Sequence, residues 1–284
     1  MIEYINKRYN KYNTHYIRMT ANVSPLRYPG GKTRACKIIE DVIQKHFDIT
    51  SFDTIISPFF GGGSFEFYMQ NKYSVMLIVN DKFTPLYNFW KQVKIDKGSL
   101  CEGLRGIDSV SKEQFMDYRK TILDLDTDTL QQAIYYFVIN RCSFSGSTLS
   151  GGFSQEASCK RFTQSSINKI EALDFTNIDL YNEDFYDFLT QQHPLHPNAL
   201  LFLDPPYYLE RKSKLYGNNG DLHEGFDHTQ LFNFLKEDRK KRWILTYNNC
   251  AFIRDLYKDF TIIDVCWKYG MNTTKESSEI IIIN

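Results

Sequence analysis

Short apolar runs alternate along the chain with segments whose apolar positions recur at helical spacing. Residues 52–57, 75–80, 199–204 and 242–248 are short and largely apolar, which is typical of buried strands. Residues 34–46 place isoleucine and valine on one face, which predicts an amphipathic helix. This alternation predicts an α/β fold built on an open, largely parallel sheet.

The spacing of these runs also predicts how neighbouring elements connect. A triple glycine follows the strand at 52–57 and leads into a helix at 64–70, which gives a strand–turn–helix–strand unit. Residues 178–189 predict a strand, an acidic turn and a helix. The apolar segments 261–270 and 278–284 predict a terminal hairpin.

Residues 96–174 interrupt this pattern. They contain acidic helical stretches and a serine- and glycine-rich segment at 143–158, which predicts a flexible loop. We interpret 96–174 as an insertion into the α/β domain. Residues 1–22 are polar and predict a leader outside the core.

Composition limits the class of protein without selecting a function. The 284 residues are 42% hydrophobic and carry a formal net charge of zero, so any contact with nucleic acid must come from local basic patches. The six cysteines form no Cys-x-x-Cys pair, which argues against a structural zinc site and suits a reducing compartment. No apolar run reaches the length of a membrane span, so we expect an intracellular protein without a membrane or metal partner.

The sharpest chemical signal is Asp204-Pro205-Pro206-Tyr207, directly after an apolar strand. Ligands of open α/β sheets bind beyond the carboxyl ends of strands, so this tetrapeptide lies where chemistry is expected. An exocyclic amine is a weak nucleophile, because its lone pair is delocalised into the ring. A carboxylate at Asp204 and the Pro205 carbonyl can accept its two N–H groups and free that lone pair, while Tyr207 offers a face for stacking.

A glycine cluster at 57–63 follows the first strand. Glycines allow close approach of the backbone to a ligand, and Asp81 lies 20 residues beyond Gly61, where a carboxylate meets ribose hydroxyls in nucleoside-binding folds. A dinucleotide fingerprint would require a further glycine at position 66. Glu66 stands there, which argues against hydride transfer.

The segment Arg27-Tyr-Pro-Gly-Gly-Lys-Thr33 ends like a phosphate-binding P-loop. That motif requires glycine at position 26, where the chain has Leu26, and a strand before it, which the sequence does not predict. A nucleoside triphosphatase is therefore excluded.

Taken in order, RYPGGKT, SPFFGGG, Asp81, NEDF at 182–185 and DPPY resemble the Dam-like adenine-N6 DNA methyltransferases. The resemblance covers residues 24–90 and 178–284. It implies a Rossmann-like class I methyltransferase domain at 1–95 and 175–284, with a mainly helical target-recognition domain at 96–174.

The resemblance also implies roles for individual residues. Asp204, Pro205, Pro206 and Tyr207 would carry out methyl transfer. The donor S-adenosylmethionine would contact Tyr28, Lys32, Pro58, Phe59, Phe60, Gly61, Gly63, Asp81, Asp184 and Phe185. One departure is Ser57, because the family usually has an acidic residue there to meet the donor's ammonium group.

The predicted insertion contains candidate DNA contacts. Asn140-Arg141 resembles the pair that opens the recognition segment in similar enzymes, and Lys160-Arg161 follows the serine- and glycine-rich segment. These side chains could reach base edges or phosphates. Arg141 could equally be a structural arginine tied to a carboxylate.

The implied function is site-specific methylation of N6 of an adenine flipped out of duplex DNA, with a cognate restriction endonuclease as an optional partner. Cytosine N4, RNA adenine or a protein glutamine are alternative substrates, since similar tetrapeptides serve there. Cytosine C5 methylation is excluded, because no cysteine follows a proline. If the protein is not an enzyme, the alternative is a non-catalytic DNA-binding regulator.

Overall fold

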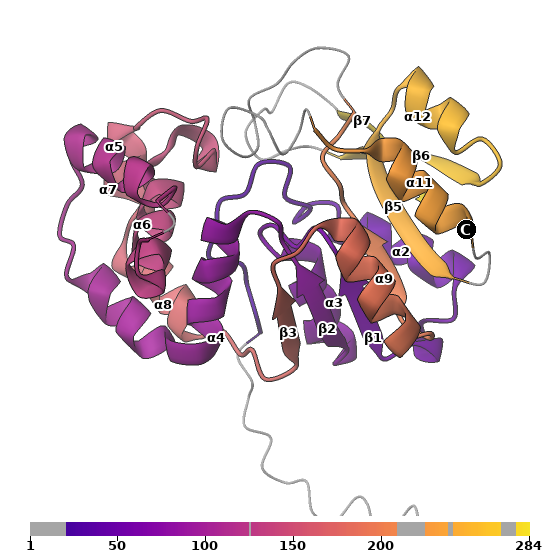
Figure 1. Cartoon of the computed structure of the whole chain (residues 1–284), viewed down its shortest axis with the longest axis horizontal. Coiled ribbons are helices and arrows are strands. Elements are labelled where there is room, and N and C mark those ends of the chain that lie inside the picture. Colours follow the sequence, from indigo (N-terminus) through magenta and orange to yellow (C-terminus); the bar gives the residue numbers. More distant parts are fainter. Residues whose placement is uncertain (1–20, 125, 209–224, 238–240, 268–276) are drawn as a thin grey trace, which may run out of the picture.

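The apolar runs form one seven-stranded sheet in the order β3-β2-β1-β4-β5-β7-β6 (Figure 1). The computed structural model describes residues 21–124, 126–208, 225–237, 241–267 and 277–284. The strands are β1 (Thr54–Ser57), β2 (Met76–Asn80), β3 (Ile178–Tyr181), β4 (Leu200–Leu203), β5 (Arg242–Asn248), β6 (Thr261–Trp267) and β7 (Ser277–Ile283).

The helices and short 3₁₀ turns of the described residues connect these strands. They are α2 (Cys36–His46), η1 (Ile49–Ser51), α3 (Ser64–Tyr73), α4 (Thr84–Arg105), α5 (Lys112–Thr121), α6 (Thr129–Cys142), η2 (Phe144–Gly146), α7 (Gln155–Arg161), α8 (Gln164–Glu171), α9 (Phe185–Leu195), α11 (His228–Lys236) and α12 (Ala251–Leu256). Each predicted strand and the predicted helices near 34–46 and 64–70 are confirmed within a few residues.

The strand order places a topological switch point between β1 and β4. The chain runs outward from β1 to β2 and β3, and then returns to β4, which pairs in parallel with β1. β7 runs antiparallel to both of its neighbours, β5 and β6, and it pairs with β6 as the predicted hairpin. Ligands of open α/β sheets bind at the carboxyl ends of strands beside such a switch point.

Both faces of the sheet are covered, which explains why its strands are continuously apolar. Successive residues of β4 point to opposite faces: Leu200 and Phe202 join a core with α2, α3 and α4, whereas Leu201 and Leu203 pack beneath α9, α11 and α12. The alternation is the two-residue period of a strand.

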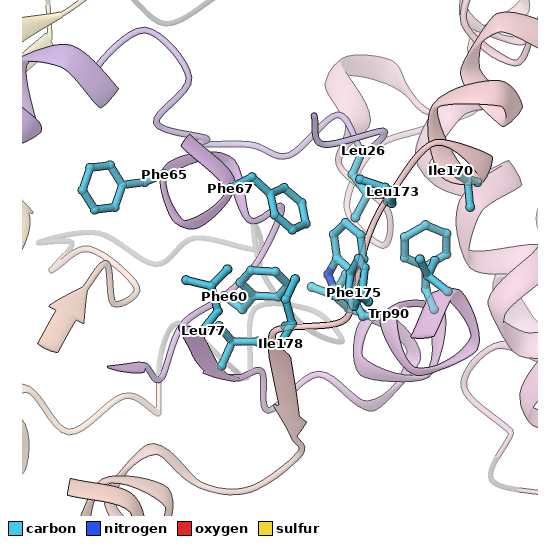
Figure 2. Close-up of a cluster of buried hydrophobic side chains, with 14 of the residues drawn as sticks. Leu26, Phe60, Phe65, Phe67, Leu77, Trp90, Ile170, Leu173, Phe175 and Ile178 are labelled. Atoms are coloured by element: carbon cyan, nitrogen blue, oxygen red, sulfur yellow. The ribbon is translucent and has the colours of Figure 1, made fainter. Parts of the chain in front are cut away.

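The predicted insertion is a helical layer at the β3 edge of the sheet (Figure 1). It begins within α4, whose backbone leaves helical geometry at Asp96 (φ −155°, ψ 65°). The hydrophobic core continues from the sheet into this layer, since Ile170 and Leu173 belong to the same buried cluster as Leu77 of β2 and Ile178 of β3 (Figure 2). The helical layer is therefore joined to the sheet by a shared core.

The prediction of a flexible loop at 143–158 is wrong in part. Ser143 and Phe153 form a β-bridge, and η2 follows directly after Ser143. The Ser154 side chain accepts a hydrogen bond from the Ala157 N–H and so begins α7 inside the predicted loop. Serine thus served as a helix cap, which composition alone does not distinguish from a loop residue.

Two features of the described chain bear on the sequence predictions. Residues 1–20 of the predicted leader lie outside the described residues. Among the helices of the described ranges, none combines the length and apolar character that a membrane span needs.

Candidate active site

A cavity of about 730 Å³ opens at the carboxyl ends of β1, β2 and β4, next to the switch point. This volume lies in the range of small-molecule sites. Every residue predicted to bind the donor or to carry out the chemistry lines it. They are Tyr28, Lys32, Pro58, Phe59, Phe60, Gly61, Gly63, Asp81, Asp184, Phe185, Asp204, Pro205, Pro206 and Tyr207.

The glycine loop after β1 is held against the end of β2. The Gly61 N–H donates to the Asp81 carboxylate at 2.9 Å, and the Trp90 indole N–H donates to the Gly61 carbonyl at 2.9 Å. Gly61 and Gly63 have positive φ angles of 51° and 66°. A Cβ at Gly61 would lie 2.7 Å from the Tyr28 ring, so only glycine allows this close packing.

Asp81 occupies the tip of β2 with one hydrogen bond on each carboxylate oxygen. Besides Gly61, the Phe83 N–H donates to it at 2.9 Å. Burial raises the pKa of Asp81 to about 6, and these two N–H groups oppose the rise. Each oxygen keeps a second lone pair, which suits acceptance of two hydroxyl groups.

The β3 side of the cavity is aromatic. The rings of Phe59, Phe185 and Phe226 form a cluster with centroids 5.0 to 5.7 Å apart. Asp184 caps the N-terminus of α9 and pairs with Lys82 at 2.8 Å. A planar ligand with an amino group would find both stacking surfaces and an acceptor here.

Asp204 is the centre of the polar contacts at the β4 side. The Lys32 ammonium lies 2.7 Å from both carboxylate oxygens and also donates to the Gly30 carbonyl at 3.0 Å. The Thr246 hydroxyl donates to Oδ1 at 2.6 Å. Lys32 is only 4% exposed, so this is a buried ion pair that joins the segment before α2 to the end of β4.

Tyr207 is fixed in orientation by Glu279, which the sequence analysis did not predict, and by Lys32, which it did. Its hydroxyl donates to the Glu279 carboxylate on β7, and the Lys32 ammonium lies 5.1 Å from its ring centroid. Tyr247 lies behind it, with ring centroids 6.1 Å apart. Thr246 interrupts the apolar run of β5, and Glu279 directly precedes the apolar run Ile280–Ile283 of β7; these polar positions beside apolar runs were the signal that could have found them.

Glu66 also lines the cavity and was noted in the sequence only as a departure from a glycine pattern. It lies in the first turn of α3, and its carboxylate accepts a hydrogen bond from Ser57 at 2.6 Å. Ser57 stands where the resemblance predicts an acidic residue, and it contacts the acidic side chain of Glu66 on the neighbouring helix α3.

Residues 144–149 of the helical layer form part of the cavity wall, opposite the sheet. The loop is anchored by Asn140, whose amide N–H group donates to the carbonyls of Arg27 and Gly146 and whose oxygen accepts from the Arg27 N–H. Asn140 is fully buried. The side chain clamps the loop to the segment that carries Tyr28, which gives Asn140 a structural role, and a contact of Asn140 with DNA stays a prediction.

The other predicted DNA contacts lie on or near the surface. The Arg141 guanidinium donates to the carbonyls of Pro25 and Arg161. Burial, and to a smaller extent repulsion from Arg27 and Arg161, lowers the pKa of Arg141 to about 10. These contacts favour the structural alternative for Arg141, with carbonyls in place of a carboxylate. Lys160 and Arg161 are exposed at the end of α7, and their contact with DNA stays a prediction.

Asn140→Ala is expected to lower the free energy of unfolding by about 1–3 kcal/mol, because the buried Arg27 amide loses its partners. Arg161→Ala should leave stability unchanged and weaken DNA binding, since its side chain is exposed. Urea denaturation and DNA titration measure the two effects. A loss of DNA affinity in Asn140→Ala without a loss of stability would contradict the clamp.

Comparison with known proteins gives two matches. Residues 28–271 match the D12 class N6 adenine-specific DNA methyltransferase family. The chain is also 22% identical to the Type II methyltransferase M.MjaIII of Methanocaldococcus jannaschii, over 91% of this chain and 98% of the relative. The family match spans both the cavity residues of the sheet and the helical layer. The chain therefore belongs to the D12 class of N6 adenine-specific DNA methyltransferases.

Proposed function

We propose that the cavity binds S-adenosylmethionine and a flipped-out adenine side by side, and that Asp204 and Pro205 activate the adenine N6. The adenine specificity comes from the family, and the donor and residue roles are our inference. The observation that carries the proposal is the position of Asp204, which faces the same cavity as the glycine loop and Asp81.

The residues of the β1–β3 side fit the proposed donor. Asp81 keeps lone pairs for two ribose hydroxyls, and the glycine loop leaves its backbone open to a ligand at the tip of β1. The aromatic rings of Phe59 and Phe185, together with Asp184, suit an adenine ring with its amino group. When bound, the donor supplies an electrophilic methyl group on a positively charged sulfur.

Asp204 and the Pro205 carbonyl would accept the two N–H groups of the target adenine. This withdraws the nitrogen lone pair from the ring and directs it toward the methyl group. The S–C bond of the donor would break as the new C–N bond forms, which leaves S-adenosylhomocysteine, and the proton lost from N6 would pass to the Asp204 carboxylate or to water. Proline at 205 stiffens the loop and offers no competing N–H donor.

Lys32 and Thr246 would hold the Asp204 side chain in one orientation. The Lys32 ammonium lies 2.7 Å from the carboxylate, and the Thr246 hydroxyl donates to Oδ1. The carboxylate is thereby held in one orientation before the base arrives, which lowers the reorganisation needed for transfer.

A stacked adenine in a duplex cannot reach this cavity, so the base must leave the helix. Tyr207 would stack on the extruded ring, because its own ring is fixed through Glu279. The wall formed by 144–149, with Phe144 exposed at its edge, would face the DNA from which the base departs.

Incubation of the protein with methyl-labelled S-adenosylmethionine and unmethylated duplex DNA tests the proposal. We expect label in N6-methyladenine after digestion to nucleosides, at one sequence context. Label in N4-methylcytosine, RNA or protein glutamine would instead identify one of the alternative substrates. Donor binding without any transfer would indicate a regulator, and a cognate restriction endonuclease should fail to cut the methylated product.

A further inference from the structure

Glu66 is a buried carboxylate in the wall of the donor cavity. It is 2% exposed and lies in the first turn of α3, directly after the glycine loop. Among the described residues, the side chain that hydrogen-bonds to its carboxylate is Ser57, whose hydroxyl donates at 2.6 Å, and Ser57 itself is fully buried at the end of β1. The carboxylate is therefore held in place by a neutral donor.

Glu66 has no ion-pair partner among the described residues. The ammonium of Lys32 is engaged with Asp204. Burial raises the pKa of Glu66 to about 8. The Ser57 hydroxyl, the Glu66 N–H and the more distant Lys32 charge oppose the rise, and the Asp204 charge adds to it. A buried carboxylate without a cation is unfavourable, so this position favours a ligand that brings positive charge.

The Glu66 carboxylate lies beside Ser57, the position at which the sequence analysis expects an acidic residue. In Dam-like enzymes the residue at the end of the first strand is usually acidic, whereas here it is Ser57. The Ser57–Glu66 hydrogen bond brings the carboxylate of a residue nine positions later next to Ser57, and Glu66 itself lines the cavity. We propose that Glu66, positioned by Ser57, receives the ammonium group of the donor's methionine portion, an inference that rests on S-adenosylmethionine being the donor.

The proposal implies that ligand binding is linked to proton release. The titratable or charged groups facing Glu66 are Lys32 and Cys36 on the segment at the start of α2, and Asp204 after β4. In the empty protein Glu66 holds its proton below about pH 8, and an arriving ammonium favours the ionised form. Affinity should therefore rise as the pH increases from 6 to 8, because the proton need no longer be displaced.

The test compares two ligands, S-adenosylhomocysteine and its analogue in which hydrogen replaces the methionine amino group. Glu66→Gln should weaken S-adenosylhomocysteine binding by roughly 10–100-fold, since a charged hydrogen bond is lost. Its affinity for the deamino analogue should equal that of the wild type. The rise in affinity between pH 6 and 8 should also disappear in Glu66→Gln.

Asp184→Asn is the matched control, because it alters a polar group at the opposite, aromatic end of the cavity. It should change the affinities of the two ligands by the same factor. Equal discrimination between the ligands in Glu66→Gln and the wild type would overturn the proposal. If the wild type binds neither ligand, the assignment of the donor itself fails.

A measurement on the wild type alone keeps the proposal testable if Glu66→Gln does not fold. Calorimetry at pH 7 in buffers of different ionisation enthalpy gives the number of protons released on binding S-adenosylhomocysteine. We expect about one proton per site, and none for the deamino analogue. Equal proton release for both ligands would contradict the role of Glu66.

Discussion

Asp204→Ala is expected to lower the single-turnover rate of methyl transfer by about 10³-fold, with donor binding retained. The alanine removes the carboxylate acceptor for the adenine N–H, so the N6 lone pair stays delocalised in the ring. The Pro205 carbonyl remains, which accounts for residual transfer. Rates measured with pre-bound DNA and donor isolate this step from binding.

Stability must be separated from chemistry in this experiment, because Asp204 is also the partner of Lys32. An unpaired buried ammonium costs about 3–5 kcal/mol, so Asp204→Ala alone will be less stable. Lys32→Met combined with Asp204→Ala removes the unpaired charge and should recover most of that stability without recovering the rate. Asp204→Asn keeps an acceptor oxygen and should fall between the wild type and Asp204→Ala. Near-normal transfer in the double variant would refute the role of Asp204.

Gly146→Ala is expected to lower both the stability of the protein and its methylation of DNA. Gly146 has a φ of 74°, and a Cβ there would lie 2.2 Å from the Arg27 carbonyl oxygen. The left-handed conformation alone costs about 1–3 kcal/mol, and the overlap with backbone adds to this. Because the 144–149 wall must shift away from Arg27, we expect a fall on the order of 100-fold in the methylation rate.

Gly152→Ala is the matched control in the same loop, because a Cβ at that position meets no atom within 4 Å. It should retain wild-type stability and activity. Urea denaturation and methylation of duplex DNA under identical conditions compare the two variants. If Gly146→Ala matches Gly152→Ala in both assays, the contact with Arg27 does not position the wall of the cavity.

The strands could be predicted from the sequence because their apolar runs are short and buried on both faces. β5 lies at the residues that its pattern indicated, from Arg242 to Asn248. The start of α7 could not be predicted in the same way. Ser154 acts there as the helix cap. The segment contains several serines, and its sequence does not indicate which of them caps a helix.

The sequence predicts which residues lie together in the cavity when motifs place those residues at the ends of strands. Asp81 and Asp204 each follow a strand directly, so the parallel sheet brings them to one edge. Contacts between distant segments were not accessible. Thr246 reaches Asp204 because β5 pairs with β4, and Asn140 is buried because a loop folds over it, which no local pattern encodes.

The core shared by the sheet and the helical layer has a consequence for engineering sequence specificity. Phe89, in the part of α4 before the layer begins, stacks on Phe137 of α6 with ring centroids 5.7 Å apart, so the layer is not a detachable module. A segment transplanted from a relative would have to reproduce this packing and the Asn140 clamp to keep the catalytic cavity intact. New target sequences are therefore better sought by varying exposed positions, such as Lys160 and Arg161, than by exchanging the whole segment.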